Sequence, residues 1–367
     1  MNPSNSRTEI AINLGDRSYG IVVGCGLLDE TGAFVRRAGF HSPIPVITDS
    51  NVGPIYAERV RTSLEREGFH AAVLTFPAGE TEKNISTLSR LYDGMAALKP
   101  ERKSGVVALG GGVVGDVAGF AAATFLRGIR FIQVPTTLLA QVDASVGGKV
   151  GIDHASGKNL IGAFHQPSAV LIDPQTLLTL DRRQIKAGLA EIVKHGVIAD
   201  AGLFETVSSA LDRLLAAEEE IYTAIIPWNC RIKARVVEQD ERESGLRAIL
   251  NFGHTIGHAV EALTGYGRYL HGEAVAIGML AEAMLGEKLG ITPPEAVQRL
   301  RSLLTTAGFP LSKPDLSADA LLESMFHDKK VERGHLRFVF PVEIGNVVIR
   351  SVEDLDLIRN TWDSYSI

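Results

Sequence analysis

Short hydrophobic runs alternate with amphipathic stretches through the first half of the chain. Runs rich in Val, Ile, Leu and Ala lie at residues 45–48, 72–75, 105–109, 131–134 and 169–172, and their length and composition predict buried strands. Residues 56–67 and 84–98, which lie between runs, carry apolar positions at helical spacing. Strands that alternate with helices indicate βαβ units, so we expect an α/β domain with a Rossmann-like parallel sheet over residues 1–180.

The pattern becomes helical after about residue 180. Apolar positions predict helices at 184–197, 203–217, 221–238, 254–263 and 273–289, and a late hairpin at 336–340 and 347–349. We therefore expect a second, mainly α-helical domain over residues 181–367. The default position for an active site is then the cleft between the two domains.

Composition and charge argue against several classes of protein. The 367 residues are enough for two cores, and the net charge of −6 argues against broad nucleic-acid binding. No apolar run has the roughly 18 residues of a membrane span, and the first ten residues are polar, without a signal-peptide core. The two cysteines, Cys25 and Cys230, lie too far apart for a thiolate zinc motif. We expect a cytoplasmic protein without a membrane or nucleic-acid partner.

A glycine-rich turn follows the strand expected at 105–109. Gly110, Gly112 and Gly115 satisfy GxGxxG between that strand and a helix expected at 117–126, a context in which free backbone N–H groups can bind a pyrophosphate. The alternative is that these glycines only allow close packing of helix and strand. The acidic residue expected about 20 residues later is absent, and Asp49, after an earlier strand, could contact a ribose instead.

Histidines and a glutamate form a candidate metal constellation. His254 and His258 are four residues apart on one expected helix, and Glu191 and His271 lie in other helical segments. The four-residue spacing places both imidazoles on one helical face, as in a zinc pair, and two histidines with one carboxylate form an open catalytic zinc site. The alternative from spacing alone is a set of hydrogen-bonded interface histidines.

Several cations in the middle of the chain lie beside glycines or polar residues. Gly148-Lys149 and Gly157-Lys158-Asn159 locally resemble phosphate loops, although they lack the spacing of a P-loop. In an acidic protein, this set favours an anionic substrate. Its members are Arg127, Lys149, Lys158, Lys194, Lys233 and Arg247.

Ordered motifs from about residue 44 to residue 348 resemble the 3-dehydroquinate synthase family of sugar phosphate cyclases. They include the segments 77–83, 110–128, 133–149, 157–164, 187–194, 240–247, 251–258, 271–275 and 328–330. The resemblance implies a homodimer that uses NAD and Zn²⁺ or Co²⁺. It also implies the conversion of 3-deoxy-D-arabino-heptulosonate 7-phosphate to 3-dehydroquinate and phosphate, in the shikimate pathway of aromatic amino acid biosynthesis. The steps are transient oxidation by NAD, β-elimination of phosphate, reduction and intramolecular aldol closure.

The resemblance also implies site residues. The metal ligands are Glu191, His254 and His271, so His258 becomes a substrate and proton-transfer residue rather than a ligand. The substrate contacts are Asp143, Lys149, Asn159, Lys194, Lys233, Arg247, Asn251, His258 and Lys330, with Arg127 reaching the phosphate pocket of a neighbouring subunit. The NAD contacts are Asp49, Ala78, Gly79, Glu80, Thr81, Glu82, Lys83, Gly112, Val113, Val114, Gly115, Asp116, Thr136, Thr137, Lys149, Lys158, Thr176, Leu177, Leu178 and Thr179.

Three alternatives stay open at this point. A metal-dependent polyol dehydrogenase of the glycerol type shares the nucleotide turn, but a neutral substrate does not require the cationic set. Another sugar phosphate cyclase would act on a substrate without a carboxylate, whereas Arg247, Asn251 and Lys330 together favour a carboxylated one. A catalytically inert NAD- or metal-binding regulator would show no turnover.

Overall fold

The computed structural model describes residues 7–265, 267–327, 331–332 and 335–366, and the chain divides into two compact units. The first comprises Met1–Leu180 and Tyr222–Glu238, and the second comprises Asp181–Ile221 and Gln239–Ile367. The sequence pattern assigned residues 222–238 to the second domain, whereas the structure groups them with the first. The reason is local contact: on helix α8 (Glu219–Gln239), the Cys230 thiol lies 3.4 Å from the Gln141 carbonyl, and Lys233 pairs with Asp143 at 2.7 Å.

A seven-stranded sheet forms the centre of the first unit, in the order β1-β2-β9-β6-β5-β3-β4. All neighbouring strands are parallel except the β1–β2 pair. The five predicted strands are confirmed to within a residue or two at each end, and the N-terminal β1–β2 hairpin adds to them. The strands are β1 (Thr8–Ile12), β2 (Tyr19–Val23), β3 (Ile44–Asp49), β4 (Ala71–Phe76), β5 (Gly105–Gly110), β6 (Arg130–Pro135) and β9 (Ala169–Ile172).

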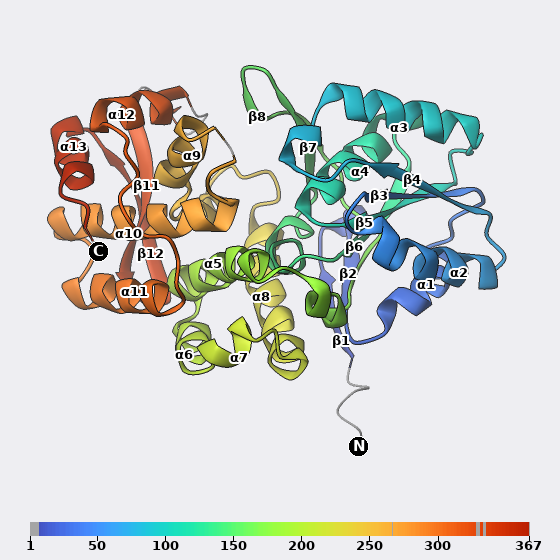
Figure 1. Cartoon of the computed structure of the whole chain (residues 1–367), viewed down its shortest axis with the longest axis horizontal. Coiled ribbons are helices and arrows are strands. Elements are labelled where there is room, and N and C mark those ends of the chain that lie inside the picture. The colour runs from blue at the N-terminus through green and yellow to red at the C-terminus, as the bar shows by residue number, and fades with distance from the viewer. Residues whose placement is uncertain (1–6, 266, 328–330, 333–334, 367) are drawn as a thin grey trace. The chain divides into compact units, whose positions relative to one another are not determined.

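Helices cover both faces of this sheet (Figure 1). Side chains alternate along each strand, so Val46 faces one apolar cluster and Ile47 the other. The first cluster takes its helical residues from α1 (Thr31–Arg37) and α2 (Glu58–Arg66), and the second from α3 (Ile85–Ala97) and α4 (Gly112–Thr124). This doubly wound arrangement confirms the predicted α/β class.

An antiparallel hairpin, β7 (Lys149–His154) and β8 (Gly157–Phe164), packs β7 against α4 in the same unit; it is drawn in green in Figure 1. The sequence had indicated loops resembling phosphate loops at Lys149 and Lys158. The structure instead places both lysines in paired strands. Gly148 has φ +67°, and a Cβ there would lie 2.5 Å from the Gln166 side chain, so this glycine is explained by the turn.

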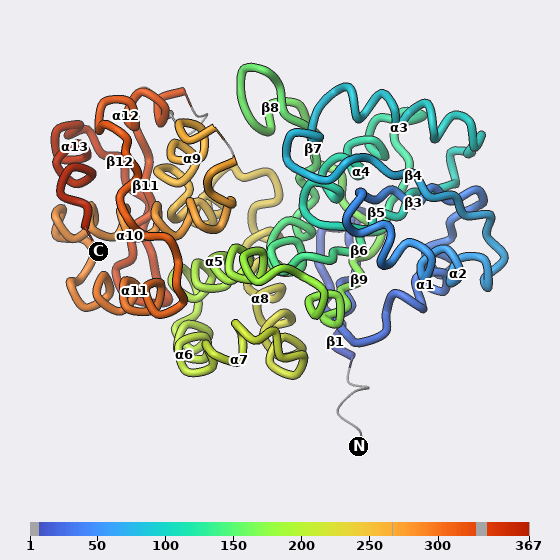
Figure 2. Tube along the Cα trace, viewed as in Figure 1, coloured from blue at the N-terminus to red at the C-terminus, as the bar shows by residue number. Residues whose placement is uncertain are grey.

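The second unit is mainly helical, as predicted, and its late hairpin is also confirmed. The long helix α10 contacts α5, α9, α11, α13 and strand β11 (Figure 2). The segment expected as one helix at 203–217 is two, because the chain breaks at Ala210 without a glycine or proline to signal it. The elements are α5 (Arg182–Ala199), α6 (Ala201–Ser209), α7 (Leu211–Leu215), α9 (His254–Leu263), α10 (His271–Lys288), α11 (Pro294–Thr306), α12 (Ala318–His327), β10 (Val331–Glu332), β11 (His335–Glu343), β12 (Asn346–Val352) and α13 (Leu355–Asp363). None of the described helices is long and apolar enough to cross a membrane.

Candidate functional site

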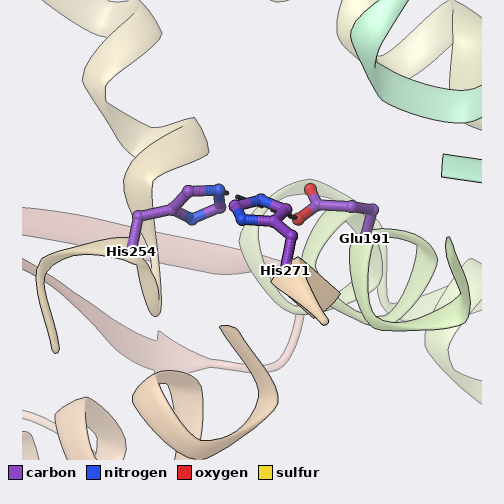
Figure 3. Close-up of side chains that lie close together, drawn as sticks. All are labelled: Glu191, His254 and His271. Carbon is purple, nitrogen blue, oxygen red and sulfur yellow. Dashed lines mark ion pairs between the residues drawn. The ribbon is translucent and has the colours of Figure 1, made fainter. Parts of the chain in front are cut away.

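Three side chains from three helices of the second unit meet at one point (Figure 3). Glu191 lies within α5, and His254 and His271 are the first residues of α9 and α10. The Nε2 atoms of the two histidines each lie 3.7 Å from the same oxygen, Oε1 of Glu191. One candidate ligand atom from each residue falls within 4.8 Å of the others, so the structure brings together the trio that the resemblance implied.

Small residues let the three helices approach closely enough to form this cluster. A Cβ on Gly278 of α10 would lie 1.9 Å from the Gly253 carbonyl, next to His254. A Cβ on Gly272, next to His271, would lie 1.9 Å from the Ala187 carbonyl of α5. Side chains at these positions would therefore force apart the helices that carry Glu191, His254 and His271.

Two buried carboxylates fix the first turns of the histidine-bearing helices. Glu282 accepts hydrogen bonds from the backbone N–H groups of Gly253 at 2.9 Å and Thr255 at 3.1 Å, at the start of α9. At the start of α10, Glu273 accepts from the Leu270 N–H at 2.8 Å and forms a two-point ion pair with Arg183 of α5. Carboxylates satisfy the free N–H groups of a helix start, so both histidines lie on anchored backbone.

The donor set fits a divalent metal ion. Both oxygens of Glu191 are buried and accept no hydrogen bond in the described part of the chain, although Lys194 forms an ion pair with the carboxylate. Nδ1 of His254 lies 3.1 Å from the Phe252 carbonyl, and Nδ1 of His271 lies 3.0 Å from Glu261. Each imidazole therefore directs Nε2 toward Glu191, and two imidazole nitrogens with a carboxylate form a common catalytic zinc set.

His258 lies beside this trio. Its ring centroid is 5.3 Å from that of His254 and 5.9 Å from that of His271. Its ligand atom groups with those of Glu261 and His271 instead of Glu191, so the pair predicted from the four-residue spacing is close in space but does not share the Glu191 cluster. Glu261 was not among the predicted site residues, although its position three residues after His258 on one helix was a usable signal.

A tight loop before α9 positions Arg247 and Asn251. The carboxylate of Asp240 accepts hydrogen bonds from the N–H groups of Ser244, Gly245 and Arg247 at 2.7–3.0 Å. Burial disfavours the charged carboxylate, but these hydrogen bonds outweigh burial and lower the pKa of Asp240 to about 2. Arg247, only 2% exposed, donates to the Glu241 carbonyl, and Asn251 donates to Glu243 at 2.9 Å. Lys330, the remaining predicted contact to a carboxylate, lies outside the described residues.

In the first unit, the glycine turn joins β5 directly to α4, which begins five residues earlier than predicted, at Gly112. A Cβ on Gly110 would lie 2.5 Å from the Val114 side chain, and one on Gly115 would lie 2.9 Å from Gln133. Packing therefore explains these two glycines. A Cβ on Gly112 would lie 3.5 Å from its nearest neighbour, an ordinary contact. Packing therefore does not require glycine here, and the absence of a side chain would instead let a ligand approach the backbone at the helix start.

Buried Lys83 pairs with the half-buried Asp116 beside this turn. The Lys83 amine lies 2.6 Å from Asp116 and also donates to the side-chain oxygen of Asn159. Burial disfavours the charged amine, but the carboxylates of Asp116 and Glu80 outweigh it and raise the pKa of Lys83. Lys158 pairs with Glu80 at 3.1 Å. These interactions bring predicted NAD contacts and the predicted substrate contact Asn159 into one cluster of the first unit, although its members lie up to 79 residues apart in the sequence.

The other predicted NAD contacts are held by hydrogen bonds at strand ends. The Asp49 carboxylate accepts from the N–H groups of Asn51 and Val52 at 2.8 and 2.9 Å. The Tyr56 hydroxyl lies 2.6 Å from that of Thr179, and the Gln141 amide donates to Thr176 at 2.9 Å. No role was predicted for Tyr56, which lies outside the matching motifs, or for Gln141, which lies within segment 133–149 but was not among the implied contacts.

Other predicted residues differ in their exposure. Lys149 is exposed at the first position of β7, and Arg127 is exposed on the turn after α4, with φ +69°. Leu177 is buried, whereas Leu178 beside it is 62% exposed. The roles of these residues stay predictions.

Comparison with known proteins decides the family. Residues 73–187 match the family model described as 3-dehydroquinate synthase N-terminal, and residues 188–331 match that described as 3-dehydroquinate synthase C-terminal. The chain belongs to the 3-dehydroquinate synthase family. A 3-dehydroquinate synthase of Desulforamulus reducens is 48% identical over 95% of this chain and 98% of the relative, and that of Geobacter metallireducens is 51% identical over 94% and 96%. The resemblance found in the sequence motifs is confirmed.

Solved structures of related cyclases share the fold of this family member. A 2-deoxy-scyllo-inosose synthase complexed with carbaglucose-6-phosphate, NAD⁺ and Co²⁺ aligns with TM-score 0.87 and 29% identity, over 96% of this chain and all of that one. The 2-epi-5-epi-valiolone synthase of Streptomyces hygroscopicus, with NAD⁺ and Zn²⁺ bound, aligns with TM-score 0.88 and 27% identity, over 96% and 98%. A glycerol dehydrogenase of Schizosaccharomyces pombe, at 18% identity and TM-score 0.68, shares the fold alone.

Proposed function

We propose that this protein is an NAD- and metal-dependent 3-dehydroquinate synthase, which converts 3-deoxy-D-arabino-heptulosonate 7-phosphate to 3-dehydroquinate and phosphate. The observation that carries the proposal is the meeting of Glu191, His254 and His271 within 4.8 Å in a chain that belongs to this family. Curated relatives of nearly the same length, at 48–51% identity, have this name. Close structural neighbours bind NAD⁺ with Co²⁺ or Zn²⁺.

Two cofactors would supply the chemistry that side chains lack. A Zn²⁺ or Co²⁺ ion held by Glu191, His254 and His271 would act as a Lewis acid toward the substrate hydroxyls. NAD would accept a hydride and return it, so it would not be consumed. We assign NAD to the first unit, at Gly112 and the start of α4, with Asp49, Lys83, Asp116 and the segment Thr176–Thr179 as further contacts.

The chain's own residues would bind and orient a substrate that carries two anionic groups. Arg247 is buried, and its planar guanidinium matches a carboxylate through two parallel hydrogen bonds. Asn251, in the same loop, would bind beside it, and Lys330 would add a second cation. Buried cations bind anions more strongly than exposed ones because less water screens them, which explains why an acidic protein can bind an anionic sugar.

A second group of residues would handle the phosphate and the protons. Lys149, Asn159, Arg127 and His258 are the proposed phosphate contacts, and His258 would hold or move a proton at the departing phosphate. The remaining proposed substrate contacts are Asp143, Lys194 and Lys233. The Lys233 amine donates to the Asp143 carbonyl at 2.6 Å as well as pairing with its carboxylate, so these two side chains orient each other.

One assay tests the proposal. The metal-loaded enzyme is incubated with the heptulosonate phosphate and substoichiometric NAD, and phosphate release is followed together with absorbance of NADH. We expect many phosphates per NAD without accumulation of NADH. One NADH per substrate and no phosphate would indicate a polyol dehydrogenase. Equal turnover of a sugar phosphate that lacks the carboxylate would indicate another cyclase, and no turnover at all would indicate a regulator.

The homodimer and the cytoplasmic location stay predictions from the resemblance and the sequence. A dimer would have a function in catalysis, because Arg127 is expected to reach the phosphate pocket of the second copy. Mixing an Arg127→Ala variant with a separately inactivated Glu191→Gln variant should restore part of the activity if the residue acts across subunits. Activity that is unchanged in Arg127→Ala would remove this residue from the phosphate site.

A further inference from the structure

The two histidines of the Glu191 cluster are held in different ways. Nδ1 of His254 lies 3.1 Å from a backbone carbonyl, that of Phe252, and this side chain is 11% exposed. Nδ1 of His271 lies 3.0 Å from the carboxylate of Glu261, and this side chain is 32% exposed. The more exposed imidazole thus depends on a side chain for its orientation, while the more buried one uses the main chain.

The position of Glu261 determines what it can do to His271. Glu261 is 3% exposed on α9, two turns after His254, and its Oε2 faces the His271 ring across the α9–α10 contact. An ionised carboxylate only accepts hydrogen bonds, so this contact places the ring proton of His271 on Nδ1. The lone pair is then on Nε2, the atom that lies 3.7 Å from Glu191.

We propose that Glu261 is a positioning residue that holds His271 as a metal ligand and sets the affinity of the Glu191–His254–His271 cluster for its metal ion. This inference rests on the proposed function, because it requires that cluster to bind a metal. Glu261 acts in two ways: it fixes the tautomer and the ring orientation of His271, and its charge makes the imidazole a stronger donor. Loss of such an outer partner typically weakens metal binding by about 10–100-fold.

The test compares two variants of Glu261 in the full-length holoenzyme. Zinc affinity is measured by competition with a chelator, and the visible spectrum of the Co²⁺-loaded protein reports ligand geometry. We expect Glu261→Ala to weaken zinc binding by about 10–100-fold and to change the Co²⁺ spectrum. Glu261→Gln keeps an acceptor for the Nδ1 proton but loses the charge, so we expect a smaller loss, roughly 3–10-fold, with a spectrum near that of the wild type.

Glu273→Gln is the matched control. Glu273 is also a buried carboxylate at the start of α10, but it bonds to the Leu270 N–H and to Arg183. The control should lower the melting temperature while zinc affinity stays within about threefold of the wild type, because no ring contact is lost. An equal loss of affinity in Glu273→Gln and Glu261→Ala would reduce the role of Glu261 to general support of the helix and would overturn the proposal.

The remaining outcomes separate this proposal from the proposed function. Wild-type protein that retains neither zinc nor cobalt would remove the metal site and both proposals with it. If His271→Ala loses metal but Glu261→Ala binds zinc within twofold of the wild type, with an unchanged Co²⁺ spectrum, only the role of Glu261 fails. If Glu261→Ala does not fold, the test rests on Glu261→Gln. A zinc affinity of Glu261→Gln equal to that of the wild type would then overturn the proposal.

Discussion

Each unit contains a carboxylate beside a buried lysine, but the two carboxylates differ in their burial and in their hydrogen bonds within the described residues. In the first unit, Asp116 pairs with Lys83, whose amine also donates to Asn159. In the second unit, Glu191 forms an ion pair with Lys194, yet both of its oxygens are buried and accept no hydrogen bond from the described residues, and two imidazoles face them. The first carboxylate has a cation partner that the fold supplies, whereas the second retains the capacity to bind a further cation.

The difference shows how to separate structural from functional ion pairs. Buried polar atoms are nearly always hydrogen-bonded, so a fully buried carboxylate without a hydrogen bond requires an explanation. For Glu191 the proposed metal ion supplies one, because the two facing imidazoles have their Nδ1 atoms bonded elsewhere and direct Nε2 toward the carboxylate. For Asp116 none is required, since its partner is present in the fold.

The largest effect should follow from neutralising each carboxylate in turn. Glu191→Gln removes a charged ligand, so we expect metal content and turnover to fall together, by more than the roughly 100-fold typical of losing an outer partner. Asp116→Asn should leave the metal content unchanged. Metal per chain, measured by mass spectrometry, and phosphate release check both. Full metal content and full activity in Glu191→Gln would exclude it as a ligand.

A smaller effect should follow from breaking the Lys83–Asp116 pair. Lys83→Met leaves the Asp116 carboxylate, whose side chain is 24% exposed, without its cation, so we expect the free energy of unfolding to fall by about 1–3 kcal/mol. Lys158→Met is the control, because its partner Glu80 has a 36% exposed side chain and such pairs contribute at most about 1 kcal/mol. Urea unfolding without NAD measures both, and equal losses would contradict the distinction.

The sequence predicted more of the fold than of the site's supporting contacts. Strand β9 and helix α9 begin and end where the apolar pattern placed them, because most residues of both elements are buried. The β7–β8 hairpin was missed, since glycines beside Lys149 and Lys158 indicated loops. Glu282 was missed for another reason: its partner Gly253 lies 29 residues away, and only the packing of α9 on α10 joins them. Glu261 had a signal in its spacing from His258, but its contact with His271, ten residues away, also depends on that packing.

The Asp240 loop gives a comparison that depends on pH. The folded-state pKa of Asp240 is about 2, below the ordinary 3.8, so its stabilisation is full above pH 4 and is lost as pH falls toward 2. We expect Asp240→Asn to lower the free energy of unfolding by about 1–2 kcal/mol at pH 7. The difference in this free energy between variant and wild type should become smaller below pH 4, where the wild-type carboxylate takes up its proton. Unfolding curves at pH 7, 4 and 3 test this, and a gap that widens in acid would contradict it.

The smallest change in stability should come from the glycine that packing leaves free. A Cβ on Gly110 would lie 2.5 Å from Val114, whereas one on Gly112 would lie 3.5 Å from Ala144. Gly110→Ala should therefore cost about 1–3 kcal/mol of stability, and Gly112→Ala should stay within about 0.5 kcal/mol of the wild type. If the pyrophosphate of NAD binds at the start of α4, Gly112→Ala should nevertheless weaken NAD binding, measured by calorimetry. An unchanged Kd would place the pyrophosphate elsewhere and leave Gly112 without a role in binding NAD.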